Sequence, residues 1–230
     1  MTKDDILEKI SKPATVFEVG GFKPDEDIKS SWVGKVLVCE QSETWPESNG
    51  EPMIPLCQIN LTNLPYVPDR LKDIQLITIF IDSEEIPSDD EKNGELWCLR
   101  AYKSLDNLIQ IDTPDYKSHI KPFQLRPKLI EKDCPCWEDC PIEIPDEFED
   151  DYYDLFANET GIKRGGWPSL VQSEIFWAPF NEHPANPEFV FQIDSVEKAQ
   201  WFWGDSGTGY FGRGTTKGHE DEWTFAWQCY

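Results

Sequence analysis

Two similar stretches, Pro55-Leu-Cys-Gln-Ile-Asn60 and Phe189-Val-Phe-Gln-Ile-Asp194, carry most of the information about the fold. Each is an apolar run that ends in Gln-Ile and then Asn or Asp, as expected of a buried β-strand. A glycine lies upstream of each run, at Gly34 and Gly165, and an apolar–aromatic pair lies downstream. The three pairs of anchors are separated by 131, 134 and 131 residues. This nearly constant offset indicates an internal duplication.

The wider pattern predicts a mainly β protein, α+β at most, with few short helices. β-branched and aromatic runs predict strands over 32–39, 55–61, 75–81, 96–102 and 125–132, and a turn over 89–94. Helices are expected near 3–11 and 146–157. We therefore expect a single domain over 1–230. Its two similar β units, at roughly 30–132 and 161–230, pack as one roll-like body joined by the acidic segment 133–160.

Charge and composition exclude several classes of protein. The 230 residues include 44 Asp and Glu against 21 Lys and Arg, so the net charge is −23. Phosphate groups must be neutralised by Lys and Arg, so we expect neither nucleic-acid nor membrane binding. The first ten residues lack the apolar core of a signal peptide. Seven cysteines are an odd number, which favours free thiols in a reducing compartment and predicts a cytoplasmic protein.

Several rare residues keep the order of a known family. They are Trp45-Pro46, Leu56-Cys-Gln-Ile-Asn-Leu61, Gly165-Gly-Trp-Pro168, Phe191-Gln-Ile-Asp-Ser195, Trp203-Gly-Asp-Ser-Gly207 and Trp227-Gln-Cys229. From about residue 30 to 230 this series resembles the YwqG-like proteins. The resemblance implies a mainly β, roll-like domain of unknown function and supplies no catalytic residues. Lys35 departs from the pattern, because it stands where the first glycine pair would have its second glycine.

The segment from Glu138 to Asp154 contains nine acidic residues and no basic residue. Such a run is either a solvated face or a docking surface for a basic partner. The candidate contact residues are Glu147, Asp150, Asp151 and Asp154. The preferred interpretation is a non-enzymatic protein-binding domain, for which an immunity-type inhibitor of a basic protein is one concrete form.

The alternative is a small-molecule or glycan-binding module. Gln58, Asn60, Gln192 and Asp194 either satisfy backbone groups where the two units meet or face a ligand cleft. That cleft would be walled by four tryptophans, which suit sugars or peptides: Trp45, Trp167, Trp203 and Trp227.

A tight turn is expected at Gly204-Asp-Ser-Gly207, with Asp205 capping backbone amides and Gly207 at positive φ. Asp205 is otherwise a candidate ligand residue. Ser206 lies in a protease-like motif, but the three histidines, His119, His183 and His219, lack the sequence setting of such an enzyme. No catalytic residue is therefore assigned.

Three cysteines, Cys134, Cys136 and Cys140, form a weak zinc candidate. The second Cys pair of a structural site is missing, and the neighbouring acids disfavour thiolates. Reduced thiols are the favoured interpretation, and no cofactor is expected.

Overall fold

The computed structural model describes residues 1–89, 91–177 and 182–230. Strands predominate along the chain, and a few short helical elements lie between groups of strands. The helical elements are α1 (Lys3–Ile10), η1 (Asp69–Leu71), η2 (Trp137–Asp139), η3 (Asp146–Phe148), α2 (Tyr152–Leu155) and η5 (Glu197–Ala199). The strands are β1 (Lys12–Val19), β2 (Trp32–Val33), β3 (Val38–Glu40), β4 (Glu47–Ser48), β5 (Glu51–Pro52), β6 (Ile54–Asn60), β7 (Leu76–Ile81), β8 (Trp97–Tyr102), β9 (Leu108–Gln110), β10 (Phe123–Asp133), β11 (Lys163–Gly165), β12 (Glu188–Asp194), β13 (Thr208–Arg213) and β14 (Trp223–Gln228).

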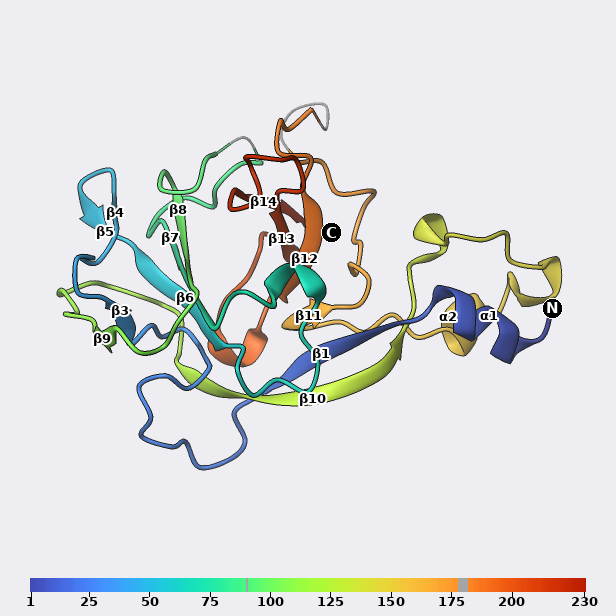
Figure 1. Ribbon diagram of the computed structural model, residues 1–230, viewed down its shortest axis with the longest axis horizontal. Helices are drawn as coiled ribbons and strands as arrows, with labels where there is room; N and C mark the ends of the chain where they lie inside the picture. Colours follow the sequence, from blue (N-terminus) through green and yellow to red (C-terminus); the bar gives the residue numbers. More distant parts are fainter. Residues whose placement is uncertain (90, 178–181) are drawn as a thin grey trace.

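Ten strands form one strongly curved sheet in the order β14-β13-β12-β11-β1-β10-β2-β6-β7-β8. All of its ladders are antiparallel. The long strand β10 passes along the base of the sheet, and the two ends of the sheet rise from it (Figure 1). The edge strands β8 and β14 face each other, with the rings of Trp97 and Phe225 5.6 Å apart. The sheet is therefore a nearly closed barrel, and the prediction of a mainly β fold is confirmed.

The strand order is symmetric about the central pair β1 and β10. On one side β2, β6, β7 and β8 follow in order, and on the other β11, β12, β13 and β14. Gln58 lies opposite Trp32 and Gln192 opposite Lys163. The ladders of both β6 and β12 have an irregularity two residues before the Gln-Ile pair begins, at Leu56 and at Val190. These matched registers support the duplication and the single-domain organisation, which both remain predictions.

The main core fills the inside of the curved sheet. It contains Ile and Leu side chains from β6 and β7 and a cluster of stacked aromatic rings from the other end of the sheet. Phe191 stacks on Phe211 with ring centroids 4.5 Å apart, and Trp203 contacts Phe225 at 5.1 Å. Burial of large aromatic side chains is the dominant stabilising term for such a core.

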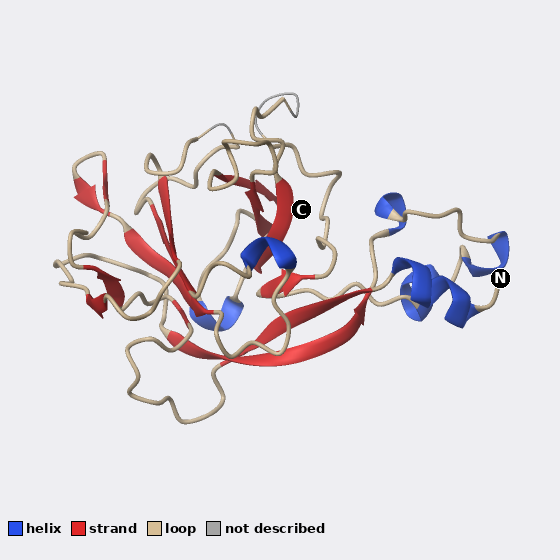
Figure 2. Cartoon of the chain, in the orientation of Figure 1, coloured by secondary structure: helices blue, strands red, loops and turns tan. Residues whose placement is uncertain are grey.

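A smaller lobe projects from the barrel where β1 begins and β10 ends (Figure 2). It holds α1, η2, η3 and α2 around a separate core that includes Ile6, Ile10, Tyr152 and Phe156. The Thr2 hydroxyl accepts a hydrogen bond from the Asp5 backbone N–H, and Asp5 bonds back to the Thr2 N–H. This capping box fixes the start of α1. No helix among the described residues has the length and apolarity needed to cross a membrane.

Two element predictions are wrong. The helix expected over 146–157 is reduced to η3 and the four-residue α2, since adjacent acids in this segment repel each other and Asp has low helix propensity. The strand expected over 32–39 is divided into β2 and β3, because Gly34 takes a φ of 72°. A side chain there would lie 2.8 Å from Ile120 and 2.9 Å from the Lys121 carbonyl oxygen. The turn at 89–94 lies partly outside the described residues.

Arg213, at the end of β13, joins three segments of the barrel end. Its guanidinium donates to both carboxylate oxygens of Asp73 and to Asp221, and its Nε donates to the Glu220 carbonyl oxygen. The hydrogen bonds from Arg213 lower the pKa values of Asp73 and Asp221. A bidentate Arg–carboxylate pair at a buried Arg is a specific clamp.

We expect this clamp to make stability fall in acid. Groups whose pKa is lowered in the folded state stabilise it above their unfolded pKa of about 3.9, and this contribution disappears as the pH drops through the folded values. The free energy of unfolding of the wild type should therefore decrease below about pH 4. In Arg213→Met the dependence should be flatter, as measured by urea unfolding between pH 7 and 2.5. Parallel curves for the two proteins would contradict this assignment.

Candidate functional site

A buried ion pair lies where the lobe meets the barrel. Lys163 of β11 and Asp133 at the end of β10 both have fully buried side chains, with Nζ and Oδ2 3.0 Å apart. The ammonium also donates to the Glu159 carbonyl oxygen and to the Ser169 hydroxyl, so all three of its N–H groups are used. Asp133 accepts from the backbone N–H groups of Glu159 and Trp167. Burial lowers the pKa of Lys163, and the Asp133 charge opposes that shift.

A second layer of polar groups continues outward from this pair. The Gln192 amide accepts from the Ser169 N–H and donates to Asp194 at 2.7 Å. Asp194 accepts in turn from the Gly161 N–H. Desolvation by burial raises the pKa of Asp194, although these hydrogen bonds act against it. We call this arrangement the polar junction: Asp133, Lys163, Ser169, Gln192 and Asp194.

A pocket of about 460 Å³ opens beside the polar junction. Asp194 and Ser169 reach it from the junction, and residues from the lobe and the C-terminal segment complete the wall: Cys136, Tyr153, Ala157, Asn158, Thr160, Leu170, Val171, Ser206, Thr208 and Tyr230. Carboxyl, hydroxyl and amide groups around a partly apolar pocket can orient a small polar ligand. Of the residues considered in the sequence, the structure brings Cys136, Asp194 and Ser206 together here.

Gln58 and Asn60 lie elsewhere. The Gln58 oxygen accepts from the N–H groups of Leu37 and Val38, and its nitrogen donates to the carbonyl oxygens of Ile28 and Ser30. The amide therefore has no free hydrogen-bonding position. Four strands separate β6 from β12 along the curved sheet. Gln58 and Gln192 therefore belong to separate hydrogen-bond networks, because the Gln192 amide bonds to Ser169 and Asp194.

The four tryptophans of the predicted cleft occupy different places. Trp45 stacks on Tyr116 at 5.1 Å in a cluster that includes Phe80 of β7 and is separate from the main core. Trp203 is fully buried in the main core. Trp167 donates from Nε1 to the Ile10 carbonyl oxygen, and Trp227 donates to that of Pro87. The four rings lie in different parts of the molecule and do not form one surface. The expectation of a single cleft walled by these tryptophans is therefore wrong.

The turn at 204–207 also differs from the expectation. Positive φ values occur at Gly204 and Ser206, not at Gly207. Gly207 is needed for another reason, because a Cβ there would lie 1.9 Å from the Gln228 carbonyl oxygen. Asp205 is exposed, and no hydrogen bond of its side chain is present among the described residues. Ser195 holds the turn instead: its hydroxyl accepts from the Trp203 N–H and donates to the Gly207 carbonyl oxygen, both at 2.9 Å.

Asp205→Ala is therefore expected to leave the melting temperature unchanged. Ser195→Ala removes two partly buried hydrogen bonds and should cost about 1–3 kcal/mol. Thermal unfolding of the two variants beside the wild type tests this difference. A loss of stability in Asp205→Ala equal to that in Ser195→Ala would restore the capping role predicted for Asp205.

The residues considered for catalysis and metal binding are also dispersed. Among the described residues, Ser206 has no histidine partner: His219 pairs with Glu222, and His119 stacks on Trp201. All seven cysteines are unpaired. Cys134 is buried in the lobe core, whereas the Cys136 thiol points to the Pro168 carbonyl oxygen. Burial raises the pKa of Cys134 to about 11, and no set of three metal-ligating side chains is assembled in the described part of the chain.

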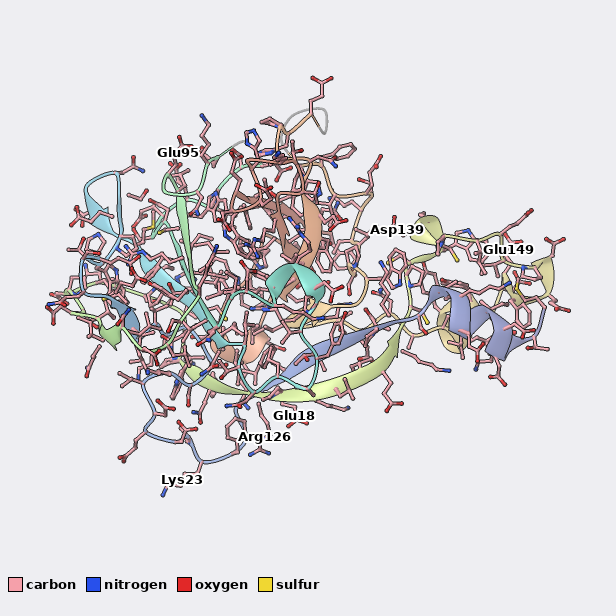
Figure 3. The ribbon with its side chains drawn as sticks, viewed as in Figure 1. Glu18, Lys23, Glu95, Arg126, Asp139 and Glu149 are labelled. Atoms are coloured by element: carbon pink, nitrogen blue, oxygen red, sulfur yellow. The ribbon has the colours of Figure 1, made fainter. Side chains whose placement is uncertain are left out.

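The acidic segment lies on the surface of the lobe. Glu147, Asp150, Asp151 and Asp154 are all exposed, and Figure 3 labels Asp139 on the side of the lobe nearer the barrel and Glu149 farther out. None of the nine acids from 138 to 154 forms an ion pair within the described residues. Desolvation raises the pKa of the half-buried Asp139, and the like charges of Glu138 and Glu174 add to this shift. We call this surface the acidic lobe face.

Sequence reasoning missed the ion pair of the polar junction. Asp133 ends a strand and Lys163 begins another, so each has the position of an ordinary solvent-exposed charge. The available signal was Gly166, which takes a φ of 65° and approaches Asp133 so closely that a Cβ would lie 2.1 Å from its Oδ2. A Gly-Gly pair after a charged strand thus marks a close backbone approach to a carboxylate.

The comparison with known families identifies the chain at the level of a family. The family described as "Domain of unknown function (DUF1963)" matches residues 32–229. The chain therefore belongs to this family, and the match includes most of the barrel, the acidic segment and the polar junction. No curated protein matches the sequence.

Proposed function

We propose that this member of the family is a non-enzymatic binding protein whose acidic lobe face docks on a basic protein. The observation that carries the proposal is the uncompensated charge of the lobe. The nine acids from Glu138 to Asp154 include eight exposed ones, and no described Lys or Arg pairs with any of them. An immunity-type inhibitor that covers a basic toxin is one form of this function.

The lobe is suited to such docking by its position. It projects from the barrel on the paired strands β1 and β10 (Figure 2), and its own core fixes the acidic segment against α1. Unpaired charges on a projecting surface create a strong local potential that accelerates encounter with an oppositely charged partner. A cytoplasmic location and membership of the narrower YwqG-like group are parts of the same proposal.

The test removes charge from the lobe without changing its shape. Glu147→Gln, Asp150→Asn, Asp151→Asn and Asp154→Asn are combined in one variant. The matched control removes four exposed charges from the barrel, as Glu26→Gln, Glu51→Gln, Glu84→Gln and Glu85→Gln. Proteins captured from the native lysate at low salt are identified, and their association with each variant is measured by stopped flow. We expect about tenfold slower association for the lobe variant.

Two further measurements test whether the acidic lobe face acts through long-range attraction. The difference between the variants should disappear at 1 M salt, where the Debye length is about 3 Å. Dissociation should change much less than association. If wild type, lobe variant and control capture the same proteins at the same rates, the acidic lobe face is a solubilising surface and the proposal is wrong.

The pocket at the polar junction supports a second candidate function, the binding of a small polar ligand. The specific observation is Asp194, which is half-buried and reaches a pocket of about 460 Å³. Thr160→Trp should close this pocket without touching the hydrogen bonds of the junction. A screen of small sugars and amines by thermal shift, at low and high salt, compares this variant with the wild type. Ligands that stabilise both proteins equally do not occupy the pocket.

A further inference from the structure

The pocket beside the polar junction, which we call the junction pocket, has one carboxyl side chain in its wall. That side chain is Asp194, and no lysine, arginine or histidine lines the pocket among the described residues. Burial raises the pKa values of the Cys136 thiol and the Tyr153 phenol above their ordinary alkaline values. The only charge that this wall can present is therefore a negative one, which favours a cationic ligand over an anionic one.

Asp194 has hydrogen-bond donors but no counter-ion. Gln192 Nε2 donates to its Oδ1 at 2.7 Å, and the Gly161 N–H donates to its Oδ2 at 2.5 Å. The Thr208 hydroxyl is a third neutral donor. Within the described residues Asp194 forms no ion pair, since Lys163 is engaged in the pair of the polar junction. A carboxylate has about four acceptor positions, so Asp194 can still accept from a cationic donor, whose charge would offset the cost of desolvation.

Two more acceptors lie in the wall of the junction pocket. Asn158 uses its Nδ2 to donate to the carbonyl oxygens of Cys134 and Pro168, so its Oδ1 is left as an acceptor. The exposed Ser206 hydroxyl forms no hydrogen bond within the described part of the chain. An ammonium group has three N–H donors and no acceptor. Its donors therefore match the acceptors of Asp194, Asn158 and Ser206 in number.

Tyr153 adds an aromatic ring to the same wall. Its hydroxyl accepts from the Trp137 N–H at 3.2 Å, and its ring packs at right angles to that of Tyr152 with centroids 5.3 Å apart. These two contacts hold an otherwise exposed ring beside the pocket. The face of a tyrosine ring attracts organic cations. Leu170 and Val171 supply apolar surface for a short alkyl chain.

We propose that the junction pocket binds the ammonium group of a small alkylamine. Asp194 pairs with the ammonium, Asn158 and Ser206 accept its remaining N–H groups, and the Tyr153 ring covers the alkyl stem. The volume of about 460 Å³ is in the usual range for a small-molecule site. This inference rests on the second candidate function above and names its ligand class. It does not require a partner at the acidic lobe face.

The experiment uses n-butylamine, which is protonated at pH 7. Its matched controls keep the alkyl chain and change the charge: 1-butanol is neutral and butanoate is an anion. Methyl glucoside represents the sugars. Each compound is titrated into the isotope-labelled full chain, and amide chemical shifts measure the dissociation constant and locate the site. The N–H groups of Gly161 and Thr208, which flank Asp194, are the expected reporters.

We expect n-butylammonium to shift these amides and the three control compounds not to do so. Asp194→Asn should weaken binding at least tenfold. The matched control Glu197→Gln removes an exposed acid outside the pocket wall and should change the dissociation constant by less than about twofold. Tyr153→Leu should weaken binding about threefold. Because Tyr153 is exposed, this variant still tests the pocket if Asp194→Asn fails to fold.

Three outcomes would overturn the proposal, and they separate it from the function on which it rests. Equal binding of 1-butanol, or an unchanged dissociation constant in Asp194→Asn and Tyr153→Leu, would remove the role of charge and ring. If butanoate or methyl glucoside shifts the same amides and Thr160→Trp abolishes the effect, the pocket binds another class of ligand and only the ammonium assignment is wrong. If no compound shifts these amides, the small-ligand function is wrong as well.

Discussion

Lys163→Met is expected to lower the free energy of unfolding by about 3–5 kcal/mol, the usual cost of leaving a buried charge without its partner. The side chains of Lys163 and Asp133 are both inaccessible to solvent. Methionine fills similar volume, but it leaves the Asp133 carboxylate and the Glu159 carbonyl oxygen without the Nζ donor. Since domains are stable by only about 5–15 kcal/mol, this is a large part of the total.

Chemical unfolding at pH 7 measures this effect, with Lys128→Met as the control on the exposed face of β10. The control should change stability by less than about 0.5 kcal/mol. In the double variant Lys163→Met with Asp133→Asn, part of the loss should be recovered, because the uncompensated charge is gone. A cost in Lys163→Met no larger than that of the control would show that the pair is not needed to join the lobe to the barrel.

Arg164→Met is expected to act in the opposite direction and to raise the free energy of unfolding by about 1–3 kcal/mol. Arg164 is fully buried among the core residues of the barrel. Its guanidinium lies 3.9 Å from the Phe191 ring centroid, but Nε and Nη2 have no hydrogen-bond partner. Desolvation lowers its pKa to about 10, so it remains charged at neutral pH without a carboxylate beside it.

Cys57 lies near Arg164 but does not supply a negative charge to balance the guanidinium. Burial raises the pKa of Cys57 to about 12, so its thiol is neutral under the same conditions. Strands β2 and β11 flank the central pair β1 and β10 on opposite sides. In β2 the residue opposite Cys57 is Val33, and in β11 the residue opposite Phe191 is Arg164. An apolar side chain is therefore compatible with this position in the barrel.

The measurement compares Arg164→Met with Arg126→Met in urea. Arg126 is exposed and lies over the Phe22 ring, so its loss removes a cation–π contact worth about 0.5–1 kcal/mol. Arg164→Met should unfold at a higher urea concentration than the wild type, and Arg126→Met at the same or a slightly lower one. Destabilisation by Arg164→Met would mean that the stacking on Phe191 outweighs the desolvation of the charge.

Properties that depend on local pattern could be predicted from the sequence alone. The apolar runs that became β6, β7 and β8 and the capped helix α1 were found within one or two residues, because periodicity and capping involve neighbours in the chain. The long β10 was recognised in part. The acidic character of 138–154 follows from composition, and its exposure was expected since unpaired charges are costly to bury.

The tertiary structure alone decided which distant residues meet. Asp133 and Lys163 carry no local sign that both are buried, and the separation of Gln58 from Gln192 depends on the four strands that lie between β6 and β12. The cover that Asn93 provides for the β8 edge at Leu99 likewise depends on which loop reaches that strand. Contacts of this kind are set by sheet order and register, in which a shift of one residue moves every side chain to the opposite face. Hydrophobic pattern therefore determined the elements of this protein, and long-range pairing determined its candidate sites.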